Sequence, residues 1–152
     1  MKMNQFKTLR VMVVIMLILL TIQYELGMVI NLSPDLPEIP PFGFSLIAIS
    51  DALHLAGPLA LAHAGLGSFL ALLSVLILIL SLKVKIKSVK LFGSLGFLTI
   101  ILATIGGVLF TLSGFQADHF SLAMGSNFIL VFISYFLELY LLKPDSPTQK
   151  NN

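Results

Sequence analysis

The sequence contains no cysteine and no tryptophan, and only 11% of its 152 residues are charged. Without cysteine, the chain cannot form a disulfide bond, a thiolate metal site, a thioether-linked haem or a cysteine nucleophile. A soluble domain of average composition carries about 25% charged residues, so this sequence does not fit a water-soluble surface. Hydrophobic residues make up 57% of the chain, and lipid is the solvent that suits such a composition. Without tryptophan, an aromatic belt at the membrane surface has to use tyrosine and phenylalanine.

Four segments are long and apolar enough to cross a bilayer, which requires about 20 residues each. They cover residues 9–30, 58–82, 91–113 and 120–142. The first segment follows a basic stretch, as in a cleaved signal peptide, but it is long and no small-residue cleavage motif follows it. We therefore interpret it as a retained anchor. The sequence predicts an all-α fold, a polytopic membrane protein with a four-helix transmembrane bundle over residues 9–142.

The basic residues predict how this bundle is oriented. All nine lie at or before the start of the first span, between the second and third, or after the fourth: Lys2, Lys7, Arg10, Lys83, Lys85, Lys87, Lys90, Lys143 and Lys150. Because positive charge accumulates on the cytoplasmic side, both termini and the lysine loop are predicted to be cytoplasmic, in the cell membrane. Residues 1–8 then form a cytoplasmic N-terminus, and residues 143–152 a disordered cytoplasmic tail.

The first outer loop has two parts. Four prolines fall within residues 34–41, which excludes a helix there because proline removes a backbone donor and fixes φ. Residues 42–56 are apolar again, but they are too few for a span and are interrupted by Asp51 and His54. They predict a short helix in the outer interface, followed by the second span at Pro58, because proline is favoured at the first helical position.

Small residues at four-residue spacing predict close helix packing, because helices in lipid gain little from burying apolar groups. One ridge runs from the interfacial helix into the second span, and another follows the third span. Their members are Ala48, Ala52, Ala56, Ala60, Ala64 and Ser68 in the first, and Thr99, Ala103, Gly107 and Thr111 in the second, with Gly93, Gly96 and Gly106 nearby. We expect the second and third spans to cross closely, and short links to make spans two to four antiparallel neighbours.

Polar side chains inside the spans are candidate sites, because placing them in lipid is costly. They are Gln23, Glu25, His63, Asn127 and Glu138. His63 lies among small residues that leave space for a flat cofactor. It is therefore a candidate axial ligand of haem b, with His119 at the same side of the membrane as the second ligand. The alternative is a histidine that is hydrogen-bonded to a neighbouring helix.

A metal site is the other candidate at the outer side. Its ligands would be drawn from His54, His63, His119, Asp51 and Asp118, the nitrogen and oxygen donors that zinc accepts, with copper also open. Glu25 either reaches the outer head groups or pairs with a histidine. Glu138 is expected to reach the cytoplasmic interface or to pair with Lys7 or Arg10.

A resemblance to known proteins covers most of the chain. The residues that carry it are Leu26-Gly27-Met28, His54, Gly57-Pro58-Leu59, Leu61, His63, Ala64, Ser121, Leu122 and Met124. In these positions the chain resembles a group of small prokaryotic membrane proteins with four spans and no established activity. It is more loosely similar to four-helix b-type membrane cytochromes and to the halves of haem A synthase. The looser likeness implies haem binding by paired histidines.

Three functions follow as hypotheses. The first is a small membrane protein that binds haem b or a metal through its outer histidines, in electron transfer or as an accessory to a respiratory complex. The second is a cofactor-free structural or assembly subunit of a larger membrane complex, or a homo-oligomer. The third is a small transporter, which the lack of a buried charge pathway disfavours. The expected surroundings are the lipid bilayer, not nucleic acid, and whether the protein is an enzyme stays open.

Overall fold

The computed structural model describes residues 3–32 and 45–143, and every element in these ranges is a helix. The helices are α1 (Met3–Leu32), α2 (Leu46–Ala56), α3 (Pro58–Lys83), α4 (Lys87–Leu112) and α5 (Asp118–Leu141). In the described ranges, α1, α3, α4 and α5 are long and apolar enough to cross a membrane. The all-α prediction and the number of candidate spans are therefore confirmed. The proline-rich segment and the predicted tail from residue 144 onward lie outside the described residues.

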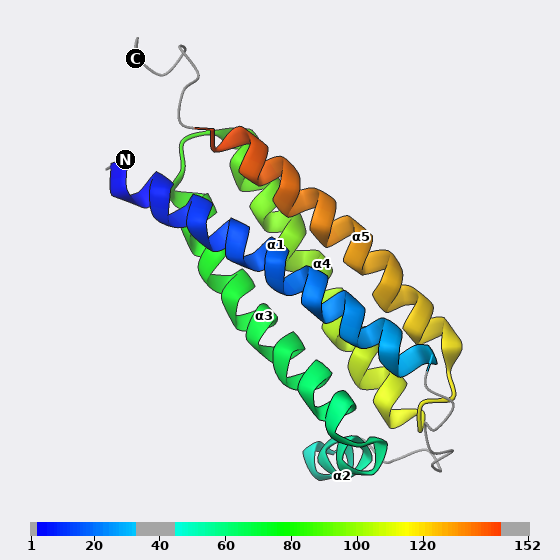
Figure 1. Cartoon of the computed structure of the whole chain (residues 1–152). Coiled ribbons are helices and arrows are strands. Elements are labelled where there is room, and N and C mark those ends of the chain that lie inside the picture. Colours follow the sequence, from blue (N-terminus) through cyan, green and yellow to red (C-terminus); the bar gives the residue numbers. More distant parts are fainter. Residues whose placement is uncertain (1–2, 33–44, 144–152) are drawn as a thin grey trace.

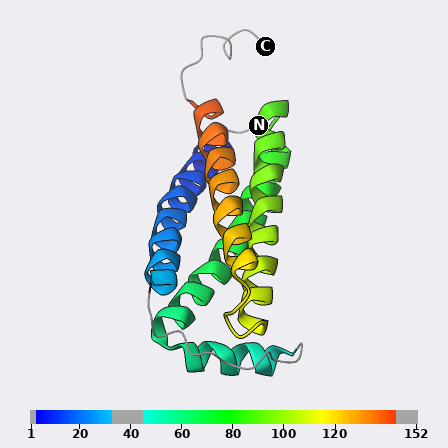
Figure 2. The ribbon, with the colours of Figure 1, turned by 90° about the vertical axis from the view of Figure 1, so that its right-hand side faces the viewer.

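The four long helices form a bundle in which α1 and α4 each pack against both α3 and α5 (Figure 1). Helix α1 begins, α5 ends and α3 connects to α4 at the same end of the bundle (Figure 1). We call it the lysine end, because the α3–α4 connection carries Lys83, Lys85 and Lys87. At the opposite end, α2 lies across the bundle and contacts α3 and α4 (Figure 2). We call this the α2 end.

Helix α2 is the short helix that the sequence predicts before Pro58, and its two ends are well defined. The Ser45 side chain accepts a 3.0 Å hydrogen bond from the Ala48 backbone nitrogen, as expected of an N-cap serine. Between α2 and α3, Gly57 has a φ of 93°, which favours glycine because a side chain would be strained there. The chain turns at this residue, so the small residues of α2 and those of α3 do not lie along one straight helix face.

Glycines of α4 bring α5 close. A Cβ atom at Gly96 would lie 2.7 Å from the Tyr135 ring, and one at Gly107 would lie 3.3 Å from the sulfur of Met124. Helix α4 does pack on α3, as expected, but these two glycines face α5 instead. The small residues of α4 therefore allow close packing against α5 as well as against α3.

Candidate functional site

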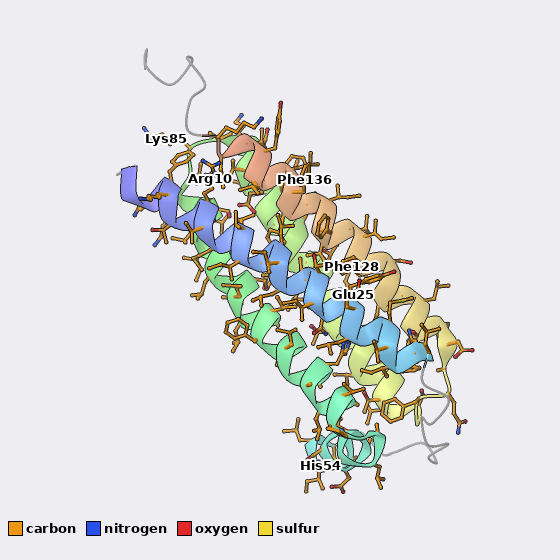
Figure 3. All side chains as sticks on the ribbon, in the orientation of Figure 1. Arg10, Glu25, His54, Lys85, Phe128 and Phe136 are labelled. Atoms are coloured by element: carbon orange, nitrogen blue, oxygen red, sulfur yellow. The ribbon has the colours of Figure 1, made fainter. Side chains whose placement is uncertain are left out.

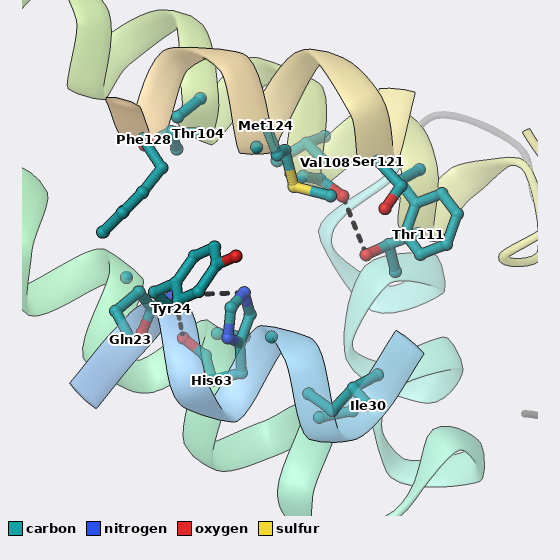
Figure 4. A pocket seen from close by; sticks show the side chains of 18 of the residues that line it. Gln23, Tyr24, Ile30, His63, Thr104, Val108, Thr111, Ser121, Met124 and Phe128 are labelled. Atoms are coloured by element: carbon teal, nitrogen blue, oxygen red, sulfur yellow. Dashed lines mark hydrogen bonds between the residues drawn. The ribbon is translucent and has the colours of Figure 1, made fainter. Parts of the chain in front are cut away.

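A cavity of about 360 Å³ lies in the half of the bundle next to α2, and all five helices contribute to its wall. Most of its lining is apolar, and the polar groups come mainly from α1 and α3. Figure 4 shows Gln23, Tyr24 and His63 on one side, with Met124 and Phe128 across from them. Representative lining residues are Gln23 and Gly27 of α1, Ile49 and Leu53 of α2, His63 and Gly67 of α3, Gly107 and Thr111 of α4, and Met124 and Phe128 of α5.

One wall of the cavity is formed by a reciprocal contact between α1 and α3. A Cβ atom at Gly27 would lie 3.0 Å from Cε1 of His63, and one at Gly67 would lie 3.2 Å from Nε2 of Gln23. In each helix the glycine follows the polar residue by four positions, so both lie on one face. Because α1 and α3 run in opposite directions (Figure 1), each polar side chain meets the glycine of the other helix. The two glycines thus make room for the two polar side chains.

The hydrogen bonds of Gln23 determine which nitrogen of His63 carries the proton. Nε2 of Gln23 donates to the backbone oxygen of His63 at 3.1 Å and lies 3.1 Å from the ring Nε2 of His63. A carbonyl oxygen only accepts, so this contact fixes the amide with its nitrogen towards His63. The ring Nε2 then accepts a hydrogen bond from the same amide, and the ring proton of the neutral imidazole lies on Nδ1.

Two polar atoms at this wall have no partner among the described residues. They are Nδ1 of His63 and Oε1 of Gln23, and both are buried. The first is a hydrogen-bond donor and the second an acceptor. Buried polar groups in folded proteins are rarely left without a partner. Both residues line the cavity, and each has one buried side-chain atom without a partner, a donor in His63 and an acceptor in Gln23.

Contacts between α1 and α5 form the adjoining wall. The rings of Tyr24 and Phe128 stack with centroids 4.6 Å apart. Near the α2 end, the side-chain amide of Asn31 donates to Ser121 Oγ at 3.1 Å. All four residues line the cavity. The α4–α5 turn closes the cavity nearby with Phe115, which has a φ of 63°, a conformation that is uncommon for a bulky side chain.

The structure separates the residues predicted to bind haem or a metal. His54 is exposed and its Nδ1 donates to the Ser50 carbonyl at 2.8 Å. His119 is exposed in the first turn of α5, with its ring 4.1 Å from that of Phe120. Neither lines the cavity that His63 lines. The pairing of His63 with His119 around one haem therefore has no support in this arrangement.

The predicted metal site is likewise not assembled. Asp51 and Asp118 are exposed on the surface of their helices. Across residues 3–32 and 45–143, no group of three or more histidine, aspartate or glutamate side chains could hold a metal ion. His54 and Asp51 lie on the exposed side of α2, away from the buried Ala52, which explains why they do not meet His63. Metal binding stays a prediction without structural support.

Of the two glutamates in the spans, Glu25 agrees with one of its two expected alternatives and Glu138 does not agree with its own. Glu25 is exposed on α1 (Figure 3) and forms no pair with any of the three histidines. The expectation that Glu138 reaches the interface or pairs with Lys7 or Arg10 is wrong, because Glu138 is 0% exposed and accepts a hydrogen bond from Ser81. Small and polar residues of α3 and α4 create a place for it inside the bundle.

Sequence reasoning also missed the role of Gln23. The signal that could have revealed it is the identical spacing of Gln23 to Gly27 and of His63 to Gly67.

Comparison of the chain with protein-family models, curated proteins and solved structures finds no match. The likeness to small prokaryotic membrane proteins and to b-type cytochromes thus gains no support, and functional inference depends on the site geometry.

Proposed function

We propose that the protein lies in the cell membrane, with α1, α3, α4 and α5 crossing the bilayer and both termini in the cytoplasm. We further propose that its cavity binds an apolar molecule that carries a hydroxyl group, taken up from the lipid phase. The lysine end would then face the cytoplasm, and the cavity would lie in the outer half of the membrane. The observation that carries the proposal is the buried donor of His63 and the buried acceptor of Gln23, both without a partner, in two residues that line an apolar cavity.

The composition of the cavity suits such a ligand. Small-molecule sites usually enclose about 300–1,000 Å³ and combine an apolar lining with a few polar groups that orient the ligand. At about 360 Å³, this cavity has room for a ring or a short stretch of chain. A buried polar group without a partner costs about 1–3 kcal/mol. A ligand that bonds both atoms removes this cost, whereas a ligand without matching groups does not. The difference favours binding of the matching ligand.

The chemistry of the two atoms favours a hydroxyl group. Nδ1–H of His63 requires an acceptor, and Oε1 of Gln23 requires a donor. A hydroxyl oxygen accepts one hydrogen bond and donates one, so one alcohol, phenol or quinol group can serve both atoms. A hydrocarbon would leave both atoms unmatched, and a ketone or ether would serve only His63.

The same hydrogen bonds argue against haem or metal at His63. Coordination requires a free lone pair on an imidazole nitrogen. The lone pair of Nε2 accepts a hydrogen bond from Gln23, and Nδ1 carries the proton. Neither nitrogen is free to coordinate without a rearrangement of Gln23. A role as a cofactor-free subunit of a larger complex has no specific contact in its favour, since the exposed apolar faces of the long helices suit lipid equally well.

Native mass spectrometry of the protein released from cell membranes tests the proposal. Ala64 lines the cavity, whereas Ala62, two residues away on α3, is exposed. We expect the wild type and Ala62→Phe to retain one small apolar molecule per chain, and Ala64→Phe to lose it because the larger ring fills the cavity. Liquid chromatography of the released molecule should show a hydroxyl group. A wild type without a bound molecule, or one that Ala64→Phe retains, would overturn the proposal.

A further inference from the structure

A second group of buried polar side chains lies near the lysine end. Glu138 of α5 is 0% exposed, and the hydroxyl group of Ser81 of α3 donates to its Oε1. A Cβ atom at Gly93 of α4 would lie 2.6 Å from Ser81 Oγ and 3.1 Å from Oε1 of Glu138. Three helices therefore meet at this carboxyl group, and the missing side chain of Gly93 leaves the space that it occupies.

Tyr135 extends this group by one turn of α5. It is 0% exposed, and a Cβ atom at Gly96 would lie 2.7 Å from its ring. The spacing of Gly93 and Gly96 on α4 matches that of Glu138 and Tyr135 on α5. Oε2 of Glu138 and the hydroxyl oxygen of Tyr135 are both buried without a partner among the described residues. The site thus holds an acid and a hydroxyl group that the surrounding residues do not satisfy.

The charge of a bare carboxylate would have no compensation here. The described basic residues lie where α1 begins, where α3 connects to α4 and where α5 ends: Lys7, Arg10, Lys83, Lys85, Lys87, Lys90 and Lys143. Oε2 of Glu138 has no partner and Oε1 is bonded to Ser81, so none of these described cations is paired with the carboxyl group. Lys143 instead lies over the Tyr140 ring at 4.2 Å. An unpaired charge buried in an apolar interior is strongly disfavoured.

The contacts of the Ser81 hydroxyl group are compatible with a protonated Glu138. Ser81 Oγ lies within hydrogen-bond distance of two acceptor oxygens, the Ile77 carbonyl at 2.7 Å and Oε1 of Glu138. A serine hydroxyl carries one proton and can donate only one hydrogen bond at a time. If that proton serves Ile77, the contact between Ser81 and Glu138 needs a proton from the carboxyl group. A carboxylic acid can bond Ser81 as donor or as acceptor and so fits either position of the serine proton, whereas a carboxylate can only accept.

We propose that Glu138 is a buried proton-binding site, with Ser81 and Tyr135 as its hydrogen-bonding neighbours. The carboxylate takes one proton from a hydronium ion and releases a water molecule, and the reverse step returns the proton to water. No other bond changes. Because Glu138 lies in the last turn of α5, the proton exchanges with water at the lysine end. This site is separate from the cavity and does not depend on the ligand proposed there.

Infrared spectroscopy of the full chain in lipid at neutral pH tests this inference. The carbonyl stretch of a protonated carboxyl group is distinct from the bands of a carboxylate. We expect the wild type to show a protonated-carboxyl band that is missing from Glu138→Gln. Ser81→Ala should keep the band and shift it, because the carboxyl group loses a hydrogen bond.

The Ser81→Ala shift keeps the test decisive even where Glu138→Gln fails to fold. Ser134 of α5 offers the matched control, because it is likewise buried and its hydroxyl group donates to the Leu130 carbonyl. Ser134→Ala should leave the band where it is. A wild type without a protonated-carboxyl band, or a band that neither Glu138→Gln nor Ser81→Ala alters, would overturn the inference.

Discussion

The side-chain amide of Gln23 bonds both the backbone carbonyl and the imidazole of His63, although the two residues lie 40 positions apart on α1 and α3. Gly67 leaves room for this contact, because a Cβ atom there would lie 3.2 Å from Nε2 of Gln23 and crowd the amide. It orients the histidine, fixes its proton on Nδ1 and leaves one buried donor and one buried acceptor without a partner in residues that line the cavity. The local geometry of one helix pair thus sets the chemistry of the site.

The tautomer of His63 is the first prediction. In the wild type, ¹⁵N NMR of histidine-labelled protein should show one neutral imidazole protonated on Nδ1, and His63→Ala should remove that signal. Gln23→Leu, which cannot donate to Nε2, should change the tautomer balance. A signal assigned to His63 with its proton on Nε2 would contradict the hydrogen-bond arrangement described above.

The glycines of the α1–α3 contact give the second prediction. Gly27→Ala places a Cβ atom 3.0 Å from the His63 ring and should destabilise the fold by about 1–3 kcal/mol, as overpacking does. Gly65→Ala is the matched control on α3, because nothing lies within 4 Å of its added Cβ. It should be neutral or stabilising, since alanine favours a helix by about 0.5–1 kcal/mol over glycine. Denaturation in mixed micelles, followed by circular dichroism, distinguishes the two.

The packing of Gly96 against Tyr135 provides the third prediction. Gly96→Ala alone should destabilise the protein, because its Cβ would lie 2.7 Å from the ring. In a Tyr135→Ala background the same change should cost less, giving a coupling energy of about 0.5–3 kcal/mol for two residues in contact. Additive effects of the two substitutions would show that these side chains do not meet.

The fourth prediction concerns the α1–α5 wall near α2. Because the chain has no native cysteine, a pair of introduced cysteines reports on one contact only. Asn31 and Ser121 are hydrogen-bonded at 3.1 Å, so Asn31→Cys with Ser121→Cys should cross-link readily under mild oxidation. Asn31→Cys with Ser126→Cys, an exposed position farther along α5, should not. Equal cross-linking of both pairs would indicate a different arrangement of α1 and α5.

Hydropathy and helix signals were sufficient to predict the helices, but not to predict which residues meet at the candidate site. The four candidate spans, the short helix before Pro58 and the break at Gly57-Pro58 all follow from local sequence. The partner of His63 does not, because the register between α1 and α3 depends on three-dimensional packing. Glu138 was wrongly expected at the surface because it lies close to the end of its span. Only the structure shows that Ser81 and Gly93 provide a buried place for it.

The haem and metal hypotheses were drawn from residue type and from a shared side of the membrane. Sequence distance along α5 could not show that the first turn of that helix would leave His119 exposed beside Phe120. His54 similarly bonds within α2 to Ser50. Residue type therefore identified His63 as unusual. Its hydrogen bond with Gln23, which only the structure shows, favours hydrogen bonding to a ligand over coordination of a metal.

Photolabelling in lipid tests the central claim most directly. The probes are a long-chain alcohol that carries a diazirine and a matched alkane without the hydroxyl group. We expect the alcohol to label cavity residues such as Met124 and Phe128 in the wild type and in Ala62→Phe. Labelling should fall by about tenfold or more in Ala64→Phe and in Gln23→Leu, corresponding to about 1.4 kcal/mol or more. Equal labelling of the cavity by alcohol and alkane, unaffected by these substitutions, would contradict that claim.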